Sequence, residues 1–483
     1  MKKQLAAAAI ATTALLSPND MLAANPAATT TPELNITLNV QNTDGRIRNI
    51  LGINNPCKLA SKWGVDGERK LLKRLNPATV RWHDAAGNNS GHALIDVSRI
   101  FPLFHADEND PRNYIFGPTD YYIAQIMDLG AVVEFRFGEQ IDHSAIRDRI
   151  RCPQDMEKWA RICMNIIRHY NEGWADGKHW NITDWSVWEE PNNLSLFRGS
   201  GKNYWESYPE YFKLYATVAK MIRKEFPNLK IGGPNAIPAV ALTDDFFPAD
   251  NLQTSFCENF LKYCQENKLP LDFFQVTHYC REPQSICTLA NKMRELTDKY
   301  GYTKTTLRIA EWNMYPQQQY FPHEEAMNST FNAAFATASL IRLLDTPIEY
   351  ASFYAWALGS KYTLFDRNYD PSPVYYGLCY FTEMSRCQNK LKPELSGSRP
   401  DGLEILSGVT ADKKVKLMVS SYQSQPTVLK VKVPGYKACE MFYLTDESGK
   451  YESKMTVYPD KDGVFSYTPS NSKHSVALLV FSK

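Results

Sequence analysis

Short apolar runs alternate with longer amphipathic segments from about residue 45 to residue 390. Eight runs rich in β-branched or aromatic residues predict strands, and they lie at 47–53, 79–83, 132–137, 185–190, 229–233, 273–279, 306–311 and 350–356. Helical spacing between them predicts helices, most clearly at 155–170, 206–226, 329–344 and 371–383. Strands that alternate with helices indicate an α/β fold with a parallel sheet, and eight such strands predict a closed (β/α)8 TIM barrel. A doubly wound open sheet is the alternative.

The pattern changes beyond about residue 395. There apolar and polar residues alternate at 403–409, 414–420, 427–433 and 475–481, with turn-forming residues such as Gly435 between the runs. This pattern predicts a C-terminal antiparallel β-sandwich. Residues 34–38 show the same alternation and are expected to add a strand to it. We therefore expect an N-terminal strand within 25–44, a barrel over 45–392 and a β-sandwich domain over 393–483.

The first 24 residues have the layout of a secretory signal peptide. Met1-Lys2-Lys3 precedes an apolar stretch at 5–16, and small residues follow at Ala23-Ala24. The stretch is shorter than the roughly 20 apolar residues that cross a bilayer, which argues against the alternative of a short membrane anchor. We expect an exported protein, periplasmic or extracellular, with no membrane insertion.

Charge and cysteine content narrow the classes of ligand. The chain has 54 Lys and Arg against 53 Asp and Glu, so its net charge of +1 gives no reason to expect nucleic acid as a partner. Ten cysteines are too few for a disulfide scaffold, and no cysteine or histidine cluster suggests a metal. Isolated thiols and pairs such as Cys257 with Cys264 or Cys280 with Cys287 both stay open.

Polar and aromatic residues gather where five of the predicted barrel strands end. In a barrel these ends face the active site. The residues are Arg81-Trp82-His83-Asp84, Glu189-Glu190, His278-Tyr279, Glu311-Trp312-Asn313 and Trp356. Glu190 and Glu311 each follow an apolar strand, and two carboxylates in different environments are what glycoside hydrolysis needs.

Two motifs carry a resemblance to a known family. Trp188-Glu189-Glu190-Pro191-Asn192 resembles the Trp-Asn-Glu-Pro-Asn signature of the retaining glycosidases of barrel clan A. Ala310-Glu311-Trp312-Asn313 is similar to the Thr-Glu-Trp-Asn strand of glycoside hydrolase family 39, the β-xylosidase and α-L-iduronidase family. Segments 230–234 and 272–274 also match the family. The resemblance implies double displacement on an oligosaccharide or polysaccharide, with Glu190 as acid and base, Glu311 as nucleophile, and no metal or organic cofactor.

The chain departs from the family pattern at Glu189, where the clan usually has an Asn that contacts the sugar's 2-hydroxyl. A carboxylate accepts hydrogen bonds but does not donate them unless it is protonated. We expect Glu189 either to pair with a cation, which Arg81 or His83 could supply, or to be held protonated, and we expect an unusual sugar at this position.

The predicted strand 273–279 also departs from the family pattern, which has a His and a Tyr two residues apart. Thr277 takes the position of the His, and Tyr279 takes the position of the Tyr. The resemblance implies further substrate contacts, and we expect them at Glu189, His83, Asn193, His278, Tyr279 and Trp356.

Two alternatives belong to other functional classes. A carbohydrate-binding protein on a degenerate barrel would keep the fold and lose catalysis, and Glu189 would then mark that loss. A transglycosylase would share every catalytic residue with a hydrolase. The sandwich either buttresses the barrel or binds sugar. Exo or endo action and the oligomeric state are not predicted.

Overall fold

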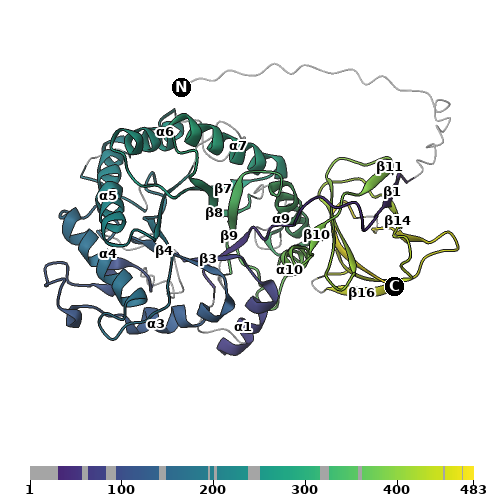
Figure 1. The fold of residues 1–483 in the computed structure, drawn as a ribbon, viewed down its shortest axis with the longest axis horizontal. Helices are drawn as coiled ribbons and strands as arrows, with labels where there is room; N and C mark the ends of the chain where they lie inside the picture. The colour runs from purple at the N-terminus through teal and green to yellow at the C-terminus, as the bar shows by residue number, and fades with distance from the viewer. Residues whose placement is uncertain are drawn as a thin grey trace, which may run out of the picture.

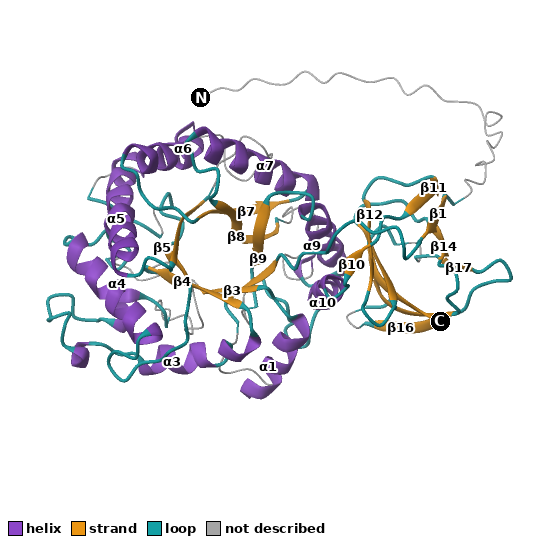
Figure 2. Cartoon of the chain, in the orientation of Figure 1, coloured by secondary structure: helices purple, strands orange, loops and turns teal. Residues whose placement is uncertain are grey.

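The computed structural model describes residues 31–56, 64–82, 94–140, 148–193, 196–200, 204–237, 251–315, 326–356, 362–449, 452–469 and 472–483. The predicted signal segment 1–24 and His83 lie outside these ranges. Eight parallel strands close into a barrel in the order of the chain (Figures 1 and 2). They are β2 (Leu51–Asn54), β3 (Thr79–Trp82), β4 (Val132–Phe137), β5 (Asp184–Val187), β6 (Lys230–Ala236), β7 (Phe273–Cys280), β8 (Thr306–Met314) and β9 (Ile348–Phe353).

Helices surround this barrel as an outer layer (Figure 1). They are α1 (Gly64–Leu75), α2 (Val97–Ile100), α3 (Gly117–Ala124), α4 (Met156–Asn171), α5 (Tyr204–Glu225), α6 (Asn251–Glu266), α7 (Pro283–Lys299), α9 (Thr330–Leu343) and α10 (Pro373–Ser385), with short 3-10 turns at Pro111–Asn113 and Met127–Leu129. α4 shows why the sequence forms a helix here. Asp155 caps its first turn by accepting a hydrogen bond from the Lys158 amide, and the stripe that includes Trp159, Ile162 and Ile166 is buried. The predicted barrel is confirmed, and an open doubly wound sheet is excluded.

Two antiparallel-rich sheets form the sandwich at the C-terminal end, as predicted. One sheet has the order β10 (Asn389–Lys390), β12 (Leu403–Val409), β13 (Val415–Ser421), β18 (Ser475–Ser482), β15 (Ala438–Thr445) and β16 (Ser453–Val457). The other has the order β11 (Glu394–Gly397), β1 (Glu33–Thr37), β14 (Val428–Lys432) and β17 (Val464–Tyr467). β1 pairs parallel with β14 and antiparallel with β11, so a strand from the start of the described chain completes this sheet.

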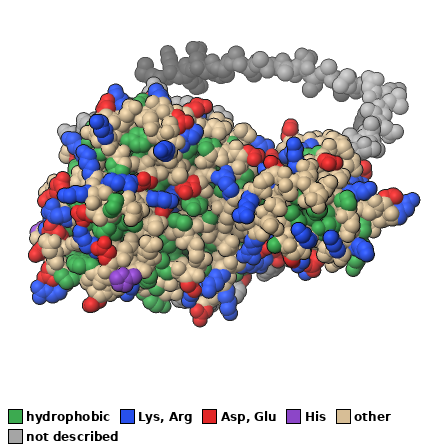
Figure 3. All heavy atoms as spheres, in the orientation of Figure 1, with side chains coloured by type: hydrophobic (Ala, Val, Ile, Leu, Met, Phe, Trp, Pro, Cys, Tyr) green, Lys and Arg blue, Asp and Glu red, His purple; other side chains and the backbone are tan. Residues whose placement is uncertain are grey.

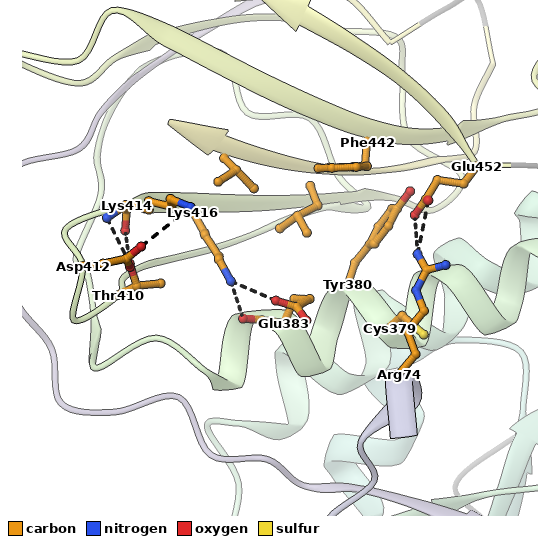
Figure 4. Close-up of a pocket in the computed structure, with 12 residues that line it drawn as sticks. Arg74, Cys379, Tyr380, Glu383, Thr410, Asp412, Lys414, Lys416, Phe442 and Glu452 are labelled. Atoms are coloured by element: carbon orange, nitrogen blue, oxygen red, sulfur yellow. Dashed lines mark hydrogen bonds and ion pairs between the residues drawn. The ribbon is translucent and has the colours of Figure 1, made fainter. Parts of the chain in front are cut away.

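The sandwich packs on the barrel through α9 and α10. The Thr337 hydroxyl of α9 lies 2.7 Å from the Ser420 hydroxyl of β13. A cavity of about 390 Å³ lies nearby, with α10 on one side and the six-stranded sheet on the other (Figure 4). Its charges pair across the joint, because Lys416 Nζ lies 3.0 Å from Glu383 Oε2 and Arg74 Nη2 lies 2.9 Å from Glu452 Oε1. These pairs connect the two domains rather than offer free charges to a ligand.

The cysteines within the described ranges are all unpaired thiols, and eight of these nine are buried. Cys257 and Cys264 both lie in α6, where a separation of seven residues places their backbones about 10 Å apart, too far for a disulfide. Cys280 and Cys287 are likewise unpaired. Among the described residues, no helix combines the length and apolar character that crossing a bilayer requires.

Candidate active site

Three glutamates meet at the carboxyl ends of the barrel strands. Glu189 and Glu190 follow β5 directly, and Glu311 lies on β8. Residue 311 pairs in register with Thr277 of β7, and the Glu190 amide donates to the Asn235 carbonyl of β6 at 3.2 Å. Residues far apart in the sequence therefore meet because neighbouring strands end at the same rim of the barrel.

The backbone around these glutamates is strained. Trp188 has a φ of 66°, Glu190 a φ of 37° and Asn235 a φ of 51°. Non-glycine residues rarely adopt this left-handed region, and such residues cluster at functional sites, where the surrounding structure holds them. β5 accordingly ends at Val187, which is earlier than the predicted 190.

Arg81, one of the two cations predicted beside Glu189, pairs with it in the structure. Its guanidinium contacts the Glu189 carboxylate, and its Nε lies 3.1 Å from Glu134 Oε1. Burial opposes the charged form of Arg81, but the carboxylates of Glu189 and Glu134 raise its pKa, so it stays a cation. The Asn235 side-chain amide donates to the other oxygen of Glu189. Glu189 is thus held between two donors and is only 2% exposed.

A chain of buried charges continues from this pair to the opposite end of the barrel. Glu134 Oε2 lies 3.5 Å from Arg308 Nη1, and Arg308 also pairs with Asp184 at the start of β5. Negative and positive groups therefore alternate along the barrel interior in the order Asp184, Arg308, Glu134, Arg81 and Glu189. Each of the five is at most 3% exposed, so every charge depends on its neighbours for compensation.

Glu190 is a carboxyl group with a raised pKa. Asn193 Nδ2 donates to its Oε2 at 3.0 Å, and the Thr277 hydroxyl, which donates to Asn235 Oδ1 at 3.5 Å, also favours the ionised form of Glu190. Burial and the charge of Glu189 together raise the pKa of Glu190 to about 7, despite these hydrogen bonds and the charge of Arg81. A carboxyl group with this pKa can exist in both protonation states near neutral pH.

Glu311 lies beside a cluster of tyrosines. Burial, followed by the charges of Glu190 and Glu189, raises its pKa, whereas the Tyr279 hydroxyl donates to Oε1 and favours the ionised form. Burial and Glu311 raise the pKa of Tyr279, which therefore remains a neutral phenol and a donor. The ring of Tyr362 lies 5.2 Å from that of Tyr279 and 6.0 Å from that of Tyr354.

Glu190 and Glu311 titrate as a coupled pair. The charge of Glu190 raises the pKa of Glu311 in this buried setting, so the two carboxyl groups do not both ionise readily. The pair can therefore hold one proton near neutral pH. One carboxylate can act as a nucleophile while the other still has a proton to give.

One predicted contact, His278, faces away from this cluster. His278 lies on the opposite side of β7 from Thr277 and Tyr279, its Nε2 is 3.1 Å from the Ser285 hydroxyl of α7, and burial lowers its pKa to about 4. It faces the helical layer because side chains alternate along a strand. Trp356 is fully buried, and its indole N–H donates to Glu68 at 3.1 Å. Asn193 does reach the cluster, as described above.

Sequence reasoning missed Asn235, Tyr354 and Tyr362. Asn235 had a usable signal, because it follows the Gly232-Gly233-Pro234 run at a predicted strand end. Tyr362 and Tyr354 had none, since neither belongs to a motif. Within the described residues, no group of three or more His, Cys, Asp or Glu side chains is arranged to hold a metal ion.

The fold and this cluster define a (β/α)8-barrel protein with paired glutamates on β5 and β8. Residues 114–368, more than half of the chain, match the family model of glycosyl hydrolases family 39. The chain belongs to this family, as the sequence motifs predicted.

Similar proteins agree with the family. A β-xylosidase of Geobacillus stearothermophilus is 23% identical over 291 residues, which cover 55% of this chain and 51% of that protein. A β-xylosidase of Caldicellulosiruptor saccharolyticus is 25% identical over 221 residues, 44% of this chain and 40% of that protein. The match thus spans about half the length of these relatives or less.

Solved structures share the fold over nearly the whole chain. A glucosidase from Croceicoccus marinus has a TM-score of 0.73 at 19% identity and covers 93% of this chain and 99% of its own. The GH39 enzyme of Xanthomonas axonopodis pv. citri has a TM-score of 0.68 at 16% identity and covers 94% and 97%.

Proposed function

We propose that the protein is an exported retaining glycoside hydrolase that cleaves a polysaccharide or its oligosaccharides by double displacement. The observation that carries the proposal is the coupled pair of Glu190 and Glu311, each with its own hydrogen-bond donors, at the active-site end of the barrel. Family membership and the β-xylosidase names of two relatives support a glycosidase. The secretory layout of residues 1–24 supports export.

In the first step, an oxygen of Glu311 attacks the anomeric carbon of the bound sugar. The bond from that carbon to the glycosidic oxygen breaks, and Glu190 gives its proton to the departing oxygen. Tyr279 orients Glu311 through its hydrogen bond, and Asn193 orients Glu190. The products are a glycosyl ester on Glu311 and the released alcohol.

In the second step, a water molecule replaces the released alcohol. Ester formation has removed the charge of Glu311, so the pKa of Glu190 falls and its carboxylate accepts a proton from the water. The water oxygen attacks the anomeric carbon, and the ester bond to Glu311 breaks. Both displacements invert the same carbon, so its configuration is retained overall.

The carboxylate of Glu189 is a reason to expect an unusual sugar in the subsite where the bond is cleaved. This carboxylate is fixed by Arg81 and Asn235 and can only accept further hydrogen bonds. A sugar hydroxyl beside it must therefore donate. A side-chain amide in this position would offer both a donor and an acceptor, so substrates selected by the two residue types are expected to differ.

The test compares the wild type with Glu311→Gln on a panel of aryl glycosides and plant and microbial polysaccharides. We expect at least one substrate to be cleaved and its turnover to fall by a factor of about 10⁴ or more in the variant, because the nucleophile is lost. Glu157→Gln, an exposed position on α4, is the matched control and should retain full activity.

A second readout separates the two carboxylates. In Glu190→Gln, aryl glycosides with acidic leaving groups should still form the ester on Glu311, since they need no proton, whereas unactivated glycosides should not react. An ester mass on Glu311 would be visible by mass spectrometry. Silence of the wild type across the whole panel, with no adduct on Glu311, would refute the proposed function.

A further inference from the structure

The two sheets of the sandwich differ in width, and this leaves the inner face of one strand uncovered. β16 ends the six-stranded sheet, and β17 ends the four-stranded sheet. Met455 of β16 pairs with Met441 of β15, so both side chains lie on the same face of the sheet. Met441 is buried in the core of the sandwich, but Met455 is 45% exposed. The six-stranded sheet therefore extends beyond the sheet that it packs against.

A groove of about 720 Å³ lies under this overhang, in the range that holds drug-sized and oligosaccharide ligands. We name it the β16–β17 groove, and its aromatic lining consists of Tyr443, Tyr458 and Tyr467. Figure 2 shows β16 along the lower edge of the sandwich and β17 on its right side. Tyr458 is 71% exposed, so the face of its ring is available to a ligand.

The polar lining of the groove consists mostly of hydroxyl groups. The hydroxyl groups beside the tyrosines come from Ser453, Thr456, Ser466 and Thr468. Among the described lining residues, Glu447 is the single acidic side chain, and there is no Lys or Arg. A charged ligand would find no opposite charges to pair with, apart from a cation at Glu447. The lining therefore favours a neutral ligand that offers both hydroxyl groups and apolar faces.

Tyr467 contributes mainly its ring to the groove. The residue is 6% exposed, and its hydroxyl oxygen is closed off from solvent. A ligand in the groove therefore contacts the ring of Tyr467 rather than its oxygen.

Pairing with another strand is disfavoured at this edge. Lys454 of β16 forms an ion pair with Glu440 at 2.8 Å, and Pro459 lies two residues beyond the end of the strand. Lysine and proline at a sheet edge oppose the addition of a strand from a second chain. The geometry points to a saccharide chain instead: we propose that the β16–β17 groove is a second carbohydrate site, which binds a neutral polysaccharide apart from the catalytic cluster.

Affinity electrophoresis tests this proposal with soluble arabinoxylan and mixed-linkage β-glucan as probes. All proteins carry Glu311→Gln, so that the polymers are not consumed during the run. We expect at least one polymer to retard the parent, and Tyr458→Ala to weaken the apparent affinity by about fivefold or more. Tyr121→Ala, which removes a 55% exposed tyrosine from α3, is the matched control and should leave the affinity unchanged.

Catalysis is measured in a separate assay, so that the proposed hydrolase activity and the proposed second carbohydrate site can be refuted independently of each other. Tyr458→Ala with Glu311 intact should hydrolyse a small aryl glycoside at the wild-type rate, because the groove lies outside the barrel. The proposal of a second carbohydrate site would be overturned if both polymers retarded Tyr458→Ala and the parent equally. It would also be overturned if neither protein were retarded. If the protein formed a concentration-dependent dimer that Tyr458→Ala abolished, the occupant of the groove would be a second copy of the chain, and the carbohydrate site would be refuted.

Discussion

Replacing Glu189 by Gln isolates the electrostatic effect of the residue that departs from the family pattern. The change keeps the shape of the side chain and removes its negative charge. That charge is the second cause, after burial, of the raised pKa of Glu190, which is about 7. Glu189→Gln also leaves Arg81 with one fewer carboxylate, and the cation then favours ionised Glu190 more strongly. Both effects lower the pKa of Glu190.

The expected shift is about one pKa unit. Two unit charges 4 Å apart interact by about 4 kcal/mol at an effective dielectric constant of about 20, and the pairing of Glu189 with Arg81 cancels much of this effect at Glu190. A remainder of about 1.4 kcal/mol corresponds to one unit. Because Glu190 must be protonated to act as the acid, the alkaline limb of kcat/KM should move from about pH 7 to about pH 6. At pH 7.5 the protonated fraction then falls about eightfold.

The assay is the pH profile of kcat/KM for a substrate with a poor leaving group, for which proton donation limits the rate. Glu189→Asp is the matched control, since it keeps the charge and should leave the alkaline limb near pH 7 even if the rate falls. Circular dichroism across the pH range verifies that each variant remains folded. An alkaline limb that stays within about 0.3 unit of the wild type in Glu189→Gln would refute the reasoning, as would an equal shift in Glu189→Asp.

Three further predictions concern other parts of the molecule. Tyr279→Phe removes a hydrogen bond that lowers the pKa of Glu311, so the acid limb of kcat/KM should move to higher pH and kcat should fall about tenfold; an unchanged acid limb would contradict this role. Arg308→Met leaves the carboxylate of Asp184 buried without its nearest cation and leaves Glu134 paired with Arg81 alone, so it should cost about 3–5 kcal/mol in chemical denaturation. The mass of the protein recovered from a bacterial periplasm or medium should correspond to a chain without residues 1–24, and an intact N-terminus would argue against export.

The barrel was predictable because its strands and helices differ in the period of their apolar residues. The predicted strand 132–137 and the observed β4 coincide, and the four predicted sandwich strands differ from the observed ones by at most two residues at either end. β16 gave no comparable signal, because most of its residues are exposed on both faces and no alternation results. The absence of the pattern has the same physical origin as the β16–β17 groove.

The site was predictable only where a motif fixed the residue. Glu190 and Glu311 each belong to a recognisable motif, and the structure places Glu190 just after β5 and Glu311 within β8, at the same rim of the barrel. The phase of β7 could not be read from the sequence, because bulges adjoin this strand on both sides: the register shifts place an extra residue, Asn235, on β6 and another, Ala310, on β8. Thr277 and Tyr279 face the cluster, whereas His278 faces α7. Sequence alternation gives the period of such a strand but not its phase relative to a bulge.

The departure at Glu189 is understandable only together with the charges below it. A third carboxylate beside Glu190 and Glu311 would ordinarily be expelled or protonated, because like charges repel strongly in a buried site. Arg81 makes it tolerable, and Arg81 in turn is held by Glu134, whose other oxygen contacts Arg308. The barrel interior therefore carries a charge pattern that suits a carboxylate at position 189. An amide there would leave Arg81 with less negative charge than it has now, so Glu189, the proposed sugar contact, and the residues of the barrel interior are coupled through one buried ion-pair chain.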